Sequence, residues 1–334
     1  EFRRVLFRSA FYYFCALGFI PFFLLMDSFY HIPALLEPTI EGLHIRPDGV
    51  YADCTFGGGG HSRAIISRLG EEGKLFSFDQ DIDAYQNRIE DKRWQFINSN
   101  FRYISNFMQY YKVDKLDGIL ADLGVSSHHF DTAERGFSFR YDAPLDMRMN
   151  RSARLTAADI VNTYSEEELS KLLFLYGELR QSRQIAKLIV RHRASQPITR
   201  TEQLLTLIKP AIGRDKDKKD LAKVFQALRI EVNDEMGALQ QLLKSSLTLL
   251  RAGGRIAILT YHSLEDRLVK NFFRSGNIEG QIEKDFYGNQ LSPFRLVNSK
   301  VITPTEKEIV LNPRARSAKL RIAELIEEQN SNSI

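Results

Sequence analysis

The sequence predicts an α/β protein whose doubly wound, mostly parallel sheet is interrupted by an all-helical insertion. Short apolar runs alternate strictly with amphipathic stretches between about residues 49 and 122. Only helical patterns follow over 141–222, and a strand pattern returns at 253–262. Strand–helix alternation is typical of parallel sheets with helices on both faces. The helical stretch is therefore expected to interrupt one α/β domain.

The individual elements follow from hydrophobic spacing and from capping signals. Strands are expected where short apolar runs occur, at 50–53, 74–79, 94–97 and 116–122. Helices are expected where apolar residues recur every three or four positions, at 61–69, 82–89 and 104–111. Ser165 with Glu168, and Thr199 with Glu202, have the form of capping boxes that open helices. A helix around 221–250 precedes the fifth strand, and strand-like runs within 294–324 are suited to closing one sheet edge.

Composition places the chain among ordinary globular proteins. Hydrophobic side chains make up 43% of its 334 residues and charged ones 26%, which excludes wholesale disorder, collagen and simple coiled coil. The net charge is only +4, so a polyanion site must come from local clustering. Two cysteines, Cys15 and Cys54, exclude a disulfide framework and a cysteine-based zinc site.

Residues 1–25 differ from the rest of the chain. Three arginines precede a charge-free apolar run over 10–26, as in a signal anchor. The run is short for a membrane span and is interrupted by Gly18 and Pro21. We expect Met26 to be the true start and residues 1–25 to be extraneous, with an anchor as the alternative. The protein is then expected to be cytoplasmic, with no membrane partner.

A glycine-rich loop and an acidic residue indicate a nucleotide-type ligand. The loop, 55–60, follows the first strand, and Asp79 ends the second. Such a loop lets the backbone approach a ligand, and such a carboxylate accepts both hydroxyls of an adenosine ribose. NAD(P) and S-adenosylmethionine share this arrangement. The NAD pattern requires a third glycine where Ser62 stands, and His61 would crowd the pyrophosphate. A tight structural turn is the alternative to a ligand site.

Asp122 adds a third element at the end of the fourth strand. Ligands of open α/β sheets lie beyond the carboxyl ends of the strands, so Gly59, Asp79 and Asp122 are expected to converge on one crevice. A carboxylate that caps neighbouring backbone N–H groups is the alternative for Asp122. The adjacent His128 and His129 have no evident third ligand, so no metal site is expected.

Eight motifs in one order resemble the RsmH/MraW methyltransferase family. They are YHIP (30–33), TFGGGGHS (55–62), DLGVSS (122–127), AERGFSF (133–139), PLDMRM (144–149), FQALR (225–229), HSLEDR (262–267) and NPRARS (312–317). Together they span residues from about 26 to 323, nearly the whole chain after its unusual start.

The resemblance implies an S-adenosylmethionine-dependent (SAM-dependent), Rossmann-like methyltransferase that methylates N4 of a cytosine in 16S rRNA. The target would be position 1402, in the decoding centre of the small ribosomal subunit. The implied methyltransferase domain covers 26–140 and 223–326, the inserted substrate-binding domain 141–222, and a tail 327–334. The family's cofactor contacts fall on Gly59, Gly60, His61, Asp79, Phe101, Asp122 and His129. A homodimer is possible.

The chemistry assigns a role to Asp122. Methyl transfer from a sulfonium is an in-line displacement that needs no metal, and positioning can supply about 7–11 kcal/mol. Because the N4 lone pair is delocalised into the ring, an acceptor for its N–H would help to localise it. We expect Asp122 in this catalytic role, with the backbone carbonyls of 123–125 as competitors. Carbon-5 methylation usually requires a cysteine nucleophile, and Cys54 at a strand end is badly placed for it.

Two features of the insertion indicate RNA. It holds 15 Lys/Arg against 11 Asp/Glu, and Arg183, Lys187 and Arg191 form a basic stripe at i, i+4, i+8. Such a stripe is typical of phosphate contacts, although a solvated helix face is the alternative. A second cationic cluster lies at 314–321, and the aromatic residues within 137–141 could either stack a displaced base or fill the core. His262 could contact the base or be structural.

Two other classes of function remain open. An NAD-dependent oxidoreductase is disfavoured by the glycine pattern. A non-catalytic RNA-binding ribosome assembly factor is disfavoured by the retained Gly59, Asp79 and Asp122.

Overall fold

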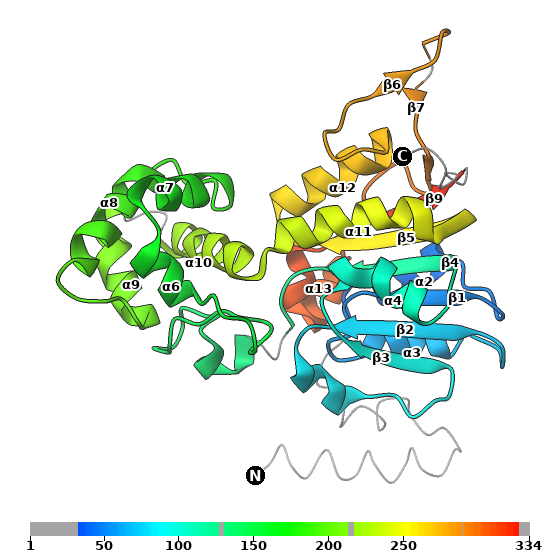
Figure 1. Ribbon diagram of the computed structural model, residues 1–334, viewed down its shortest axis with the longest axis horizontal. Helices are drawn as coiled ribbons and strands as arrows, with labels where there is room; N and C mark the ends of the chain where they lie inside the picture. The colour runs from blue at the N-terminus through cyan, green and yellow to red at the C-terminus, as the bar shows by residue number, and fades with distance from the viewer. Residues whose placement is uncertain (1–32, 127–129, 213–216, 289, 327–334) are drawn as a thin grey trace, which may run out of the picture. The chain divides into compact units, whose positions relative to one another are not determined.

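The computed structural model describes residues 33–126, 130–212, 217–288 and 290–326 (Figure 1). The expected leader 1–25, the tail 327–334 and His129 lie outside these residues. Within the described ranges, no helix has the length and apolarity needed to cross a membrane.

A seven-stranded sheet is the framework of the described chain (Figure 1). Its strands are β1 (Val50–Asp53), β2 (Lys74–Asp79), β3 (Trp94–Asn98), β4 (Leu116–Asp122), β5 (Leu250–Thr260), β8 (Phe294–Leu296) and β9 (Lys319–Leu325). They lie in the order β3-β2-β1-β4-β5-β9-β8. β1 to β5 pair in parallel, whereas β9 is antiparallel to both its neighbours. This mostly parallel sheet confirms the predicted fold class.

The strand order reverses between β1 and β4. β2 and β3 follow on one side, and β4 and β5 on the other. Ligands of open sheets bind at such a switch point, beyond the carboxyl ends of the strands. The sequence suits this arrangement because β4 is buried along its length and ends in the half-buried Asp122. A polar residue is therefore held at the edge where a ligand would bind.

Helices cover both faces of the sheet and bury separate apolar clusters. One face packs against α4 (Ile104–Tyr110), α11 (Glu235–Leu249) and α12 (Ser263–Ser275), with Met108, Leu242 and Phe272 among the buried residues. The other face packs against α2 (Leu36–Leu43) and α3 (Gly60–Ile66). The doubly wound arrangement is thus the one that the alternating sequence pattern predicts.

The insertion has an apolar core of its own. Its helices are α6 (Ala157–Thr163), α7 (Glu166–Leu175), α8 (Ser182–Arg193), α9 (Thr201–Ile208) and α10 (Asp217–Asn233), which form one group in Figure 1. Their buried cluster extends from Phe137 to Val232. The predicted boundary at 222 falls inside α10, so this helix spans the junction. The division into domains stays a prediction.

Two expected helices differ from the structure. The segment expected as an α-helix at 82–89 is the 3₁₀ helix η2 (Ile82–Asn87). Only Ala84 in it is buried, while Ile82 and Tyr85 are exposed, so no apolar face supports a longer helix. The single helix expected around 221–250 is two helices, because Asp234 between α10 and α11 has a left-handed φ of 44°.

One of the two predicted capping boxes is confirmed. Ser165 and Glu168 form the reciprocal hydrogen bonds that open α7. The box expected from Thr199 and Glu202 is wrong, because α9 begins at Thr201 and the Gln203 side chain accepts from the backbone N–H of Arg200 at 3.1 Å.

The C-terminal segment closes one sheet edge, as predicted. β8 and β9 supply this edge, with α13 (Glu306–Leu311) and the 3₁₀ helix η7 (Pro313–Ser317) between them. A separate hairpin of β6 (Glu283–Lys284) and β7 (Gln290–Leu291) precedes β8.

Candidate active site

The glycine loop after β1 leaves open space beside its backbone. Gly59 begins α3 with φ 75°, and a Cβ there would lie 2.5 Å from Nη1 of Arg63. A Cβ at Gly60 would clash with Pro33. Gly57 also has a positive φ of 49°, but a Cβ at Gly57 would meet no atom within 4 Å. Gly59 and Gly60 thus make the turn, whereas Gly57 borders the side that a ligand can approach.

Asp79 lies beside this loop, as predicted. Its Oδ2 accepts from the backbone N–H of Gly57 at 2.8 Å, and its Oδ1 accepts from that of Asp81 at 2.9 Å. Each carboxylate oxygen can accept a second hydrogen bond, which is the capacity that two ribose hydroxyls require. Burial raises the pKa of Asp79 to about 7, with the two backbone hydrogen bonds opposing the rise.

Phe101 follows β3 at the same end of the sheet. It opens the 3₁₀ helix η3 (Phe101–Tyr103) and is half-buried against the cluster beneath the sheet. Before it, Asn100 donates to the side chain of Gln80, the residue that follows Asp79. This hydrogen bond connects the loops after β2 and β3, so Phe101 lies near the loop that follows Asp79. Its contact with the adenine stays a prediction of the family resemblance.

Asp122 lies at the switch point with one carboxylate oxygen bonded. Its Oδ1 accepts from the hydroxyl of Tyr261 at 2.7 Å. Its Oδ2 lies 3.7 Å from Nδ1 of the buried His61, beyond hydrogen-bond distance. The Asp122 backbone N–H donates to Oγ1 of Thr55 at 2.6 Å, which joins the end of β4 to the glycine loop. The predicted Gly59, His61 and Asp122 therefore belong to one local structure.

Burial also perturbs the ionisation of Asp122. Burial, together with the negative charges of Asp53 and Glu265, raises the pKa of Asp122 to about 7, and the Tyr261 hydrogen bond opposes this rise. A titratable group with such a pKa is suited to accepting or releasing a proton near neutral pH.

Asp53, at the end of β1, is a site residue that the sequence analysis passed over. It is buried, accepts from Oγ of Ser62 at 2.6 Å and from the backbone N–H of Thr55 at 3.0 Å, and its pKa is raised by burial. Its charge raises the pKa of both Asp79 and Asp122. A carboxylate at the carboxyl end of a parallel strand was the sequence signal that could have identified Asp53. The rule was used only for Asp79, which ends β2, and for Asp122, which ends β4.

The region after β5 holds a polar network that sequence reasoning did not find. Glu235, His262 and Glu265 bring ligand-type atoms within 4.8 Å of one another. Both oxygens of Glu235, however, accept from Arg229, at 2.8 and 2.9 Å. His262 caps α12, with Nε2 3.1 Å from Glu265. His262 therefore has a structural contact as the cap of α12, and the Arg229 ion pair accounts for Glu235. A contact of His262 with the base stays a prediction.

The basic stripe is exposed as predicted. Arg183, Lys187 and Arg191 are exposed on α8, and within the described ranges no carboxylate lies at ion-pair distance from them. The opposite face of the helix buries Ile185 and Ile189 in the insertion core.

The other two RNA-binding candidates, the aromatic residues within 137–141 and the cationic cluster at 314–321, are largely occupied by contacts within the protein. Phe137 is buried and Phe139 packs edge-on against Phe225, so these aromatic rings fill the core, and only Tyr141 is exposed. In the C-terminal cationic cluster, Arg314 pairs with Asp131, and both Lys319 and Arg321 pair with Asp266. Two carboxylates thus offset about half of the four positive charges in that cluster.

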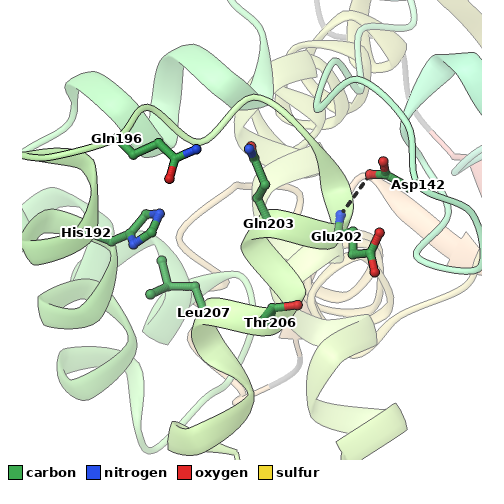
Figure 2. A pocket seen from close by; sticks show the side chains of 7 residues that line it. All are labelled: Asp142, His192, Gln196, Glu202, Gln203, Thr206 and Leu207. Carbon is green, nitrogen blue, oxygen red and sulfur yellow. Dashed lines mark hydrogen bonds between the residues drawn. The ribbon is translucent and has the colours of Figure 1, made fainter.

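A pocket of about 500 Å³ lies in the insertion (Figure 2). The residues that line it are Asp142, His192, Gln196, Glu202, Gln203, Thr206 and Leu207. Figure 2 shows the Glu202 backbone N–H bonded to Asp142, at 3.2 Å. None of the predicted site residues lines it, although His192 directly follows Arg191 of the stripe.

A mostly parallel sheet with a glycine loop after β1 and carboxylates ending β1, β2 and β4 is typical of α/β enzymes that bind a nucleotide-type cofactor at the switch point. The model of the MraW methylase family matches residues 28–326, and the chain belongs to this family. The membership confirms the prediction of a methyltransferase with SAM as its methyl donor.

Similar proteins from several bacteria carry a consistent name. Ribosomal RNA small subunit methyltransferase H of Parabacteroides distasonis is 60% identical over 301 residues, covering 90% of this chain and 99% of that protein. The protein of the same name from Bacteroides thetaiotaomicron is 59% identical over 295 residues, covering 88% and 97%. A crystal structure of an rRNA methylase from Streptococcus thermophilus covers 89% and 99%, with 11% identity and a TM-score of 0.39. That last likeness is too slight to bear on function.

Proposed function

We propose that this protein transfers a methyl group from SAM to the exocyclic N4 of a cytosine in 16S rRNA, at position 1402, within the small ribosomal subunit. The names of the similar proteins support the small ribosomal subunit as the substrate particle and ribosomal RNA as the molecule that is methylated. The motif resemblance supports N4 of cytosine as the methylated atom and 1402 as its position. The observation that carries the chemistry is Asp122, a half-buried carboxylate at the switch point with Oδ1 bonded and Oδ2 outside hydrogen-bond distance of His61.

The chain's own residues account for binding the donor. Asp79 is placed to accept from the ribose hydroxyls, Phe101 to contact the adenine, and the backbone at Gly57 to allow close approach. The carboxylates of Asp53, Asp79 and Asp122 lie at the carboxyl ends of neighbouring strands and make the electrostatic potential there negative. This potential attracts a sulfonium and repels the diphosphate of NAD, which argues against the oxidoreductase alternative.

The geometry around Asp122 suits attack by an amine. SAM supplies, when bound, a methyl group on a sulfonium whose sulfur keeps the electron pair of the broken C–S bond. The N4 amine forms the new N–C bond with its lone pair and gives up one proton. We assign Oδ2 of Asp122 to accept a hydrogen bond from that N–H, which localises the lone pair, and then to take the proton. A pKa near 7 suits both tasks.

Nucleoside analysis tests the proposed reaction. Small subunits from cells that lack the modification are incubated with the full chain and isotopically labelled SAM, and the rRNA is digested to nucleosides. We expect label in N4-methylcytidine, at about one equivalent per subunit. Label in 5-methylcytidine, or no transfer to subunits by a chain that binds SAM, would contradict the proposal.

SAM affinity should depend on pH. Asp79 and Asp122 each have a raised pKa of about 7, so both are partly protonated near neutral pH in the free protein. Ribose hydroxyls and a sulfonium favour the ionised carboxylates, so binding releases protons. Affinity should therefore rise by about tenfold or more between about pH 6 and 8 and then level off. Calorimetry in two buffers of different ionisation enthalpy measures the released protons; an affinity that falls with pH is the contrary result.

The basic stripe is assigned to RNA phosphates. Replacing Arg183, Lys187 and Arg191 together with alanine should weaken binding to small subunits and lower the slope of log K against log salt by about 2 to 3. A matched triple replacement of Lys74, Lys92 and Lys112, exposed cations outside the insertion, should leave the slope unchanged. Equal slopes for the stripe variant and the wild type would show that the stripe is merely solvated.

A further inference from the structure

Tyr261 contacts the proposed catalytic carboxylate directly. It follows β5 immediately, and its hydroxyl donates to Oδ1 of Asp122 at 2.7 Å. β4 and β5 are parallel neighbours with Asp122 paired to Leu259, so the two residues meet across the strand ends despite a separation of 139 positions.

Tyr261 is itself held on several sides. Its backbone N–H donates to Oε2 of Glu265 at 2.9 Å, and Glu265 is only 2% exposed. The ring packs against the apolar cluster that lies beneath α2 and α3. The hydroxyl is therefore fixed relative to the strand ends.

A fixed donor on Oδ1 determines what Oδ2 can do. A carboxylate can turn about its Cβ–Cγ bond and exchange its two oxygens, but a hydrogen bond from a rigid phenol holds one orientation. Oδ2 then keeps its acceptor capacity, since His61 Nδ1 lies 3.7 Å away. Preorganised acceptors of this kind avoid reorganisation during reaction.

We propose that Tyr261 is a positioning residue for methyl transfer, whose hydroxyl holds Oδ1 of Asp122 so that Oδ2 accepts from the substrate amine. The inference rests on the proposed function of Asp122 and deepens it.

The charges around Asp122 provide a readout that a structural role alone would not give. Asp53 from β1 and Glu265 from α12 raise the pKa of Asp122, as burial does, and the Tyr261 hydroxyl lowers it. His61 from α3 lies at ion-pair distance from Oδ2. Removing the hydroxyl should therefore raise the pKa of Asp122 and leave less of the ionised acceptor at neutral pH.

The test compares Tyr261→Phe with the wild type as the full chain, using saturating SAM and small subunits between about pH 6 and 9.5. We expect the rising limb of kcat to move up by about one pH unit, which makes kcat about fivefold lower at pH 7 and about tenfold lower at pH 6. The KM for subunits should stay within about twofold, whereas the SAM affinity at pH 7 should fall by no more than about fivefold, the loss that a raised pKa of Asp122 alone would cause. Tyr164→Phe is the matched control, because that hydroxyl also donates to a carboxylate, Glu231, at 2.9 Å in the insertion. It should behave as the wild type.

A second variant keeps the test decisive if Tyr261→Phe is poorly folded. Incorporating 3-fluorotyrosine at position 261 makes the hydroxyl a stronger hydrogen-bond donor to Asp122. The rising limb of the profile of kcat against pH should then move to lower pH. An unchanged limb in a folded variant of either kind overturns the positioning role. If Asp122→Asn also retains wild-type activity, the proposed function fails as well; if Asp122→Asn is inactive, only the role of Tyr261 is removed.

Discussion

Replacing Asp122 with alanine is expected to abolish turnover, and replacing it with asparagine should lower kcat by about 10²- to 10⁴-fold, the usual contribution of a positioned proton acceptor. Asparagine keeps the shape and can still accept the Tyr261 hydrogen bond at its amide oxygen. The other side of the amide, however, donates where Oδ2 accepts. The N4–H of the substrate would then meet a donor.

Single-turnover methyl transfer to small subunits measures this effect, with SAM binding followed separately by calorimetry. Asp114→Ala is a suitable control, because Asp114 is an exposed carboxylate outside the strand ends. Wild-type rates in Asp122→Ala would remove Asp122 from the mechanism. If the variant bound SAM weakly but transferred the methyl group at the wild-type rate once SAM was saturating, Asp122 would act only in cofactor binding.

Arg135→Met is expected to destabilise the protein by about 3–5 kcal/mol, because it leaves a buried charge without its partner. Arg135 and Asp81 are each 5% exposed and lie 2.8 Å apart. Arg135 also donates to the backbone carbonyls of Arg148 and Met149. It thus joins the loop after β2, beside Asp79, to the segment that leads into the insertion.

Urea unfolding monitored by circular dichroism measures the loss. Arg267→Met is the matched control, because Arg267 pairs with Glu178 at 2.9 Å while 61% exposed, and such pairs contribute about 0–1 kcal/mol. Adding Asp81→Asn to Arg135→Met should restore part of the stability by removing the stranded charge. Equal unfolding midpoints for Arg135→Met and Arg267→Met would show that the buried pair does not hold this junction.

Local sequence rules predicted the strand-end residues well. Gly59, Asp79 and Asp122 could be placed together because parallel strands bring their carboxyl ends to one edge, whatever the exact register. Asp53 obeys the same rule and could have been found by applying it to β1.

Contacts between distant segments could not be predicted in the same way. Tyr261 reaches Asp122 only because Asp122 is in register with Leu259 across β4 and β5. Buried parallel strands are near-continuous apolar runs, which lack the alternation that would indicate register from sequence. The C-terminal cations were predicted to form an RNA-binding cluster because their carboxylate partner is distant in the sequence. Asp266, which pairs with Lys319 and Arg321, is more than fifty positions away from them. The exposed stripe on α8 was predictable because helical spacing alone decides which side chains share a face.

Calorimetric titration of the full chain with SAM, and in parallel with NAD, tests most directly whether the carboxylate-lined crevice is a methyl-donor site. One equivalent of SAM should bind to the wild type, with binding greatly weakened in Asp79→Ala and no detectable heat from NAD. A folded wild-type chain that binds NAD, or that binds SAM equally well without Asp79, would contradict the assignment of the crevice.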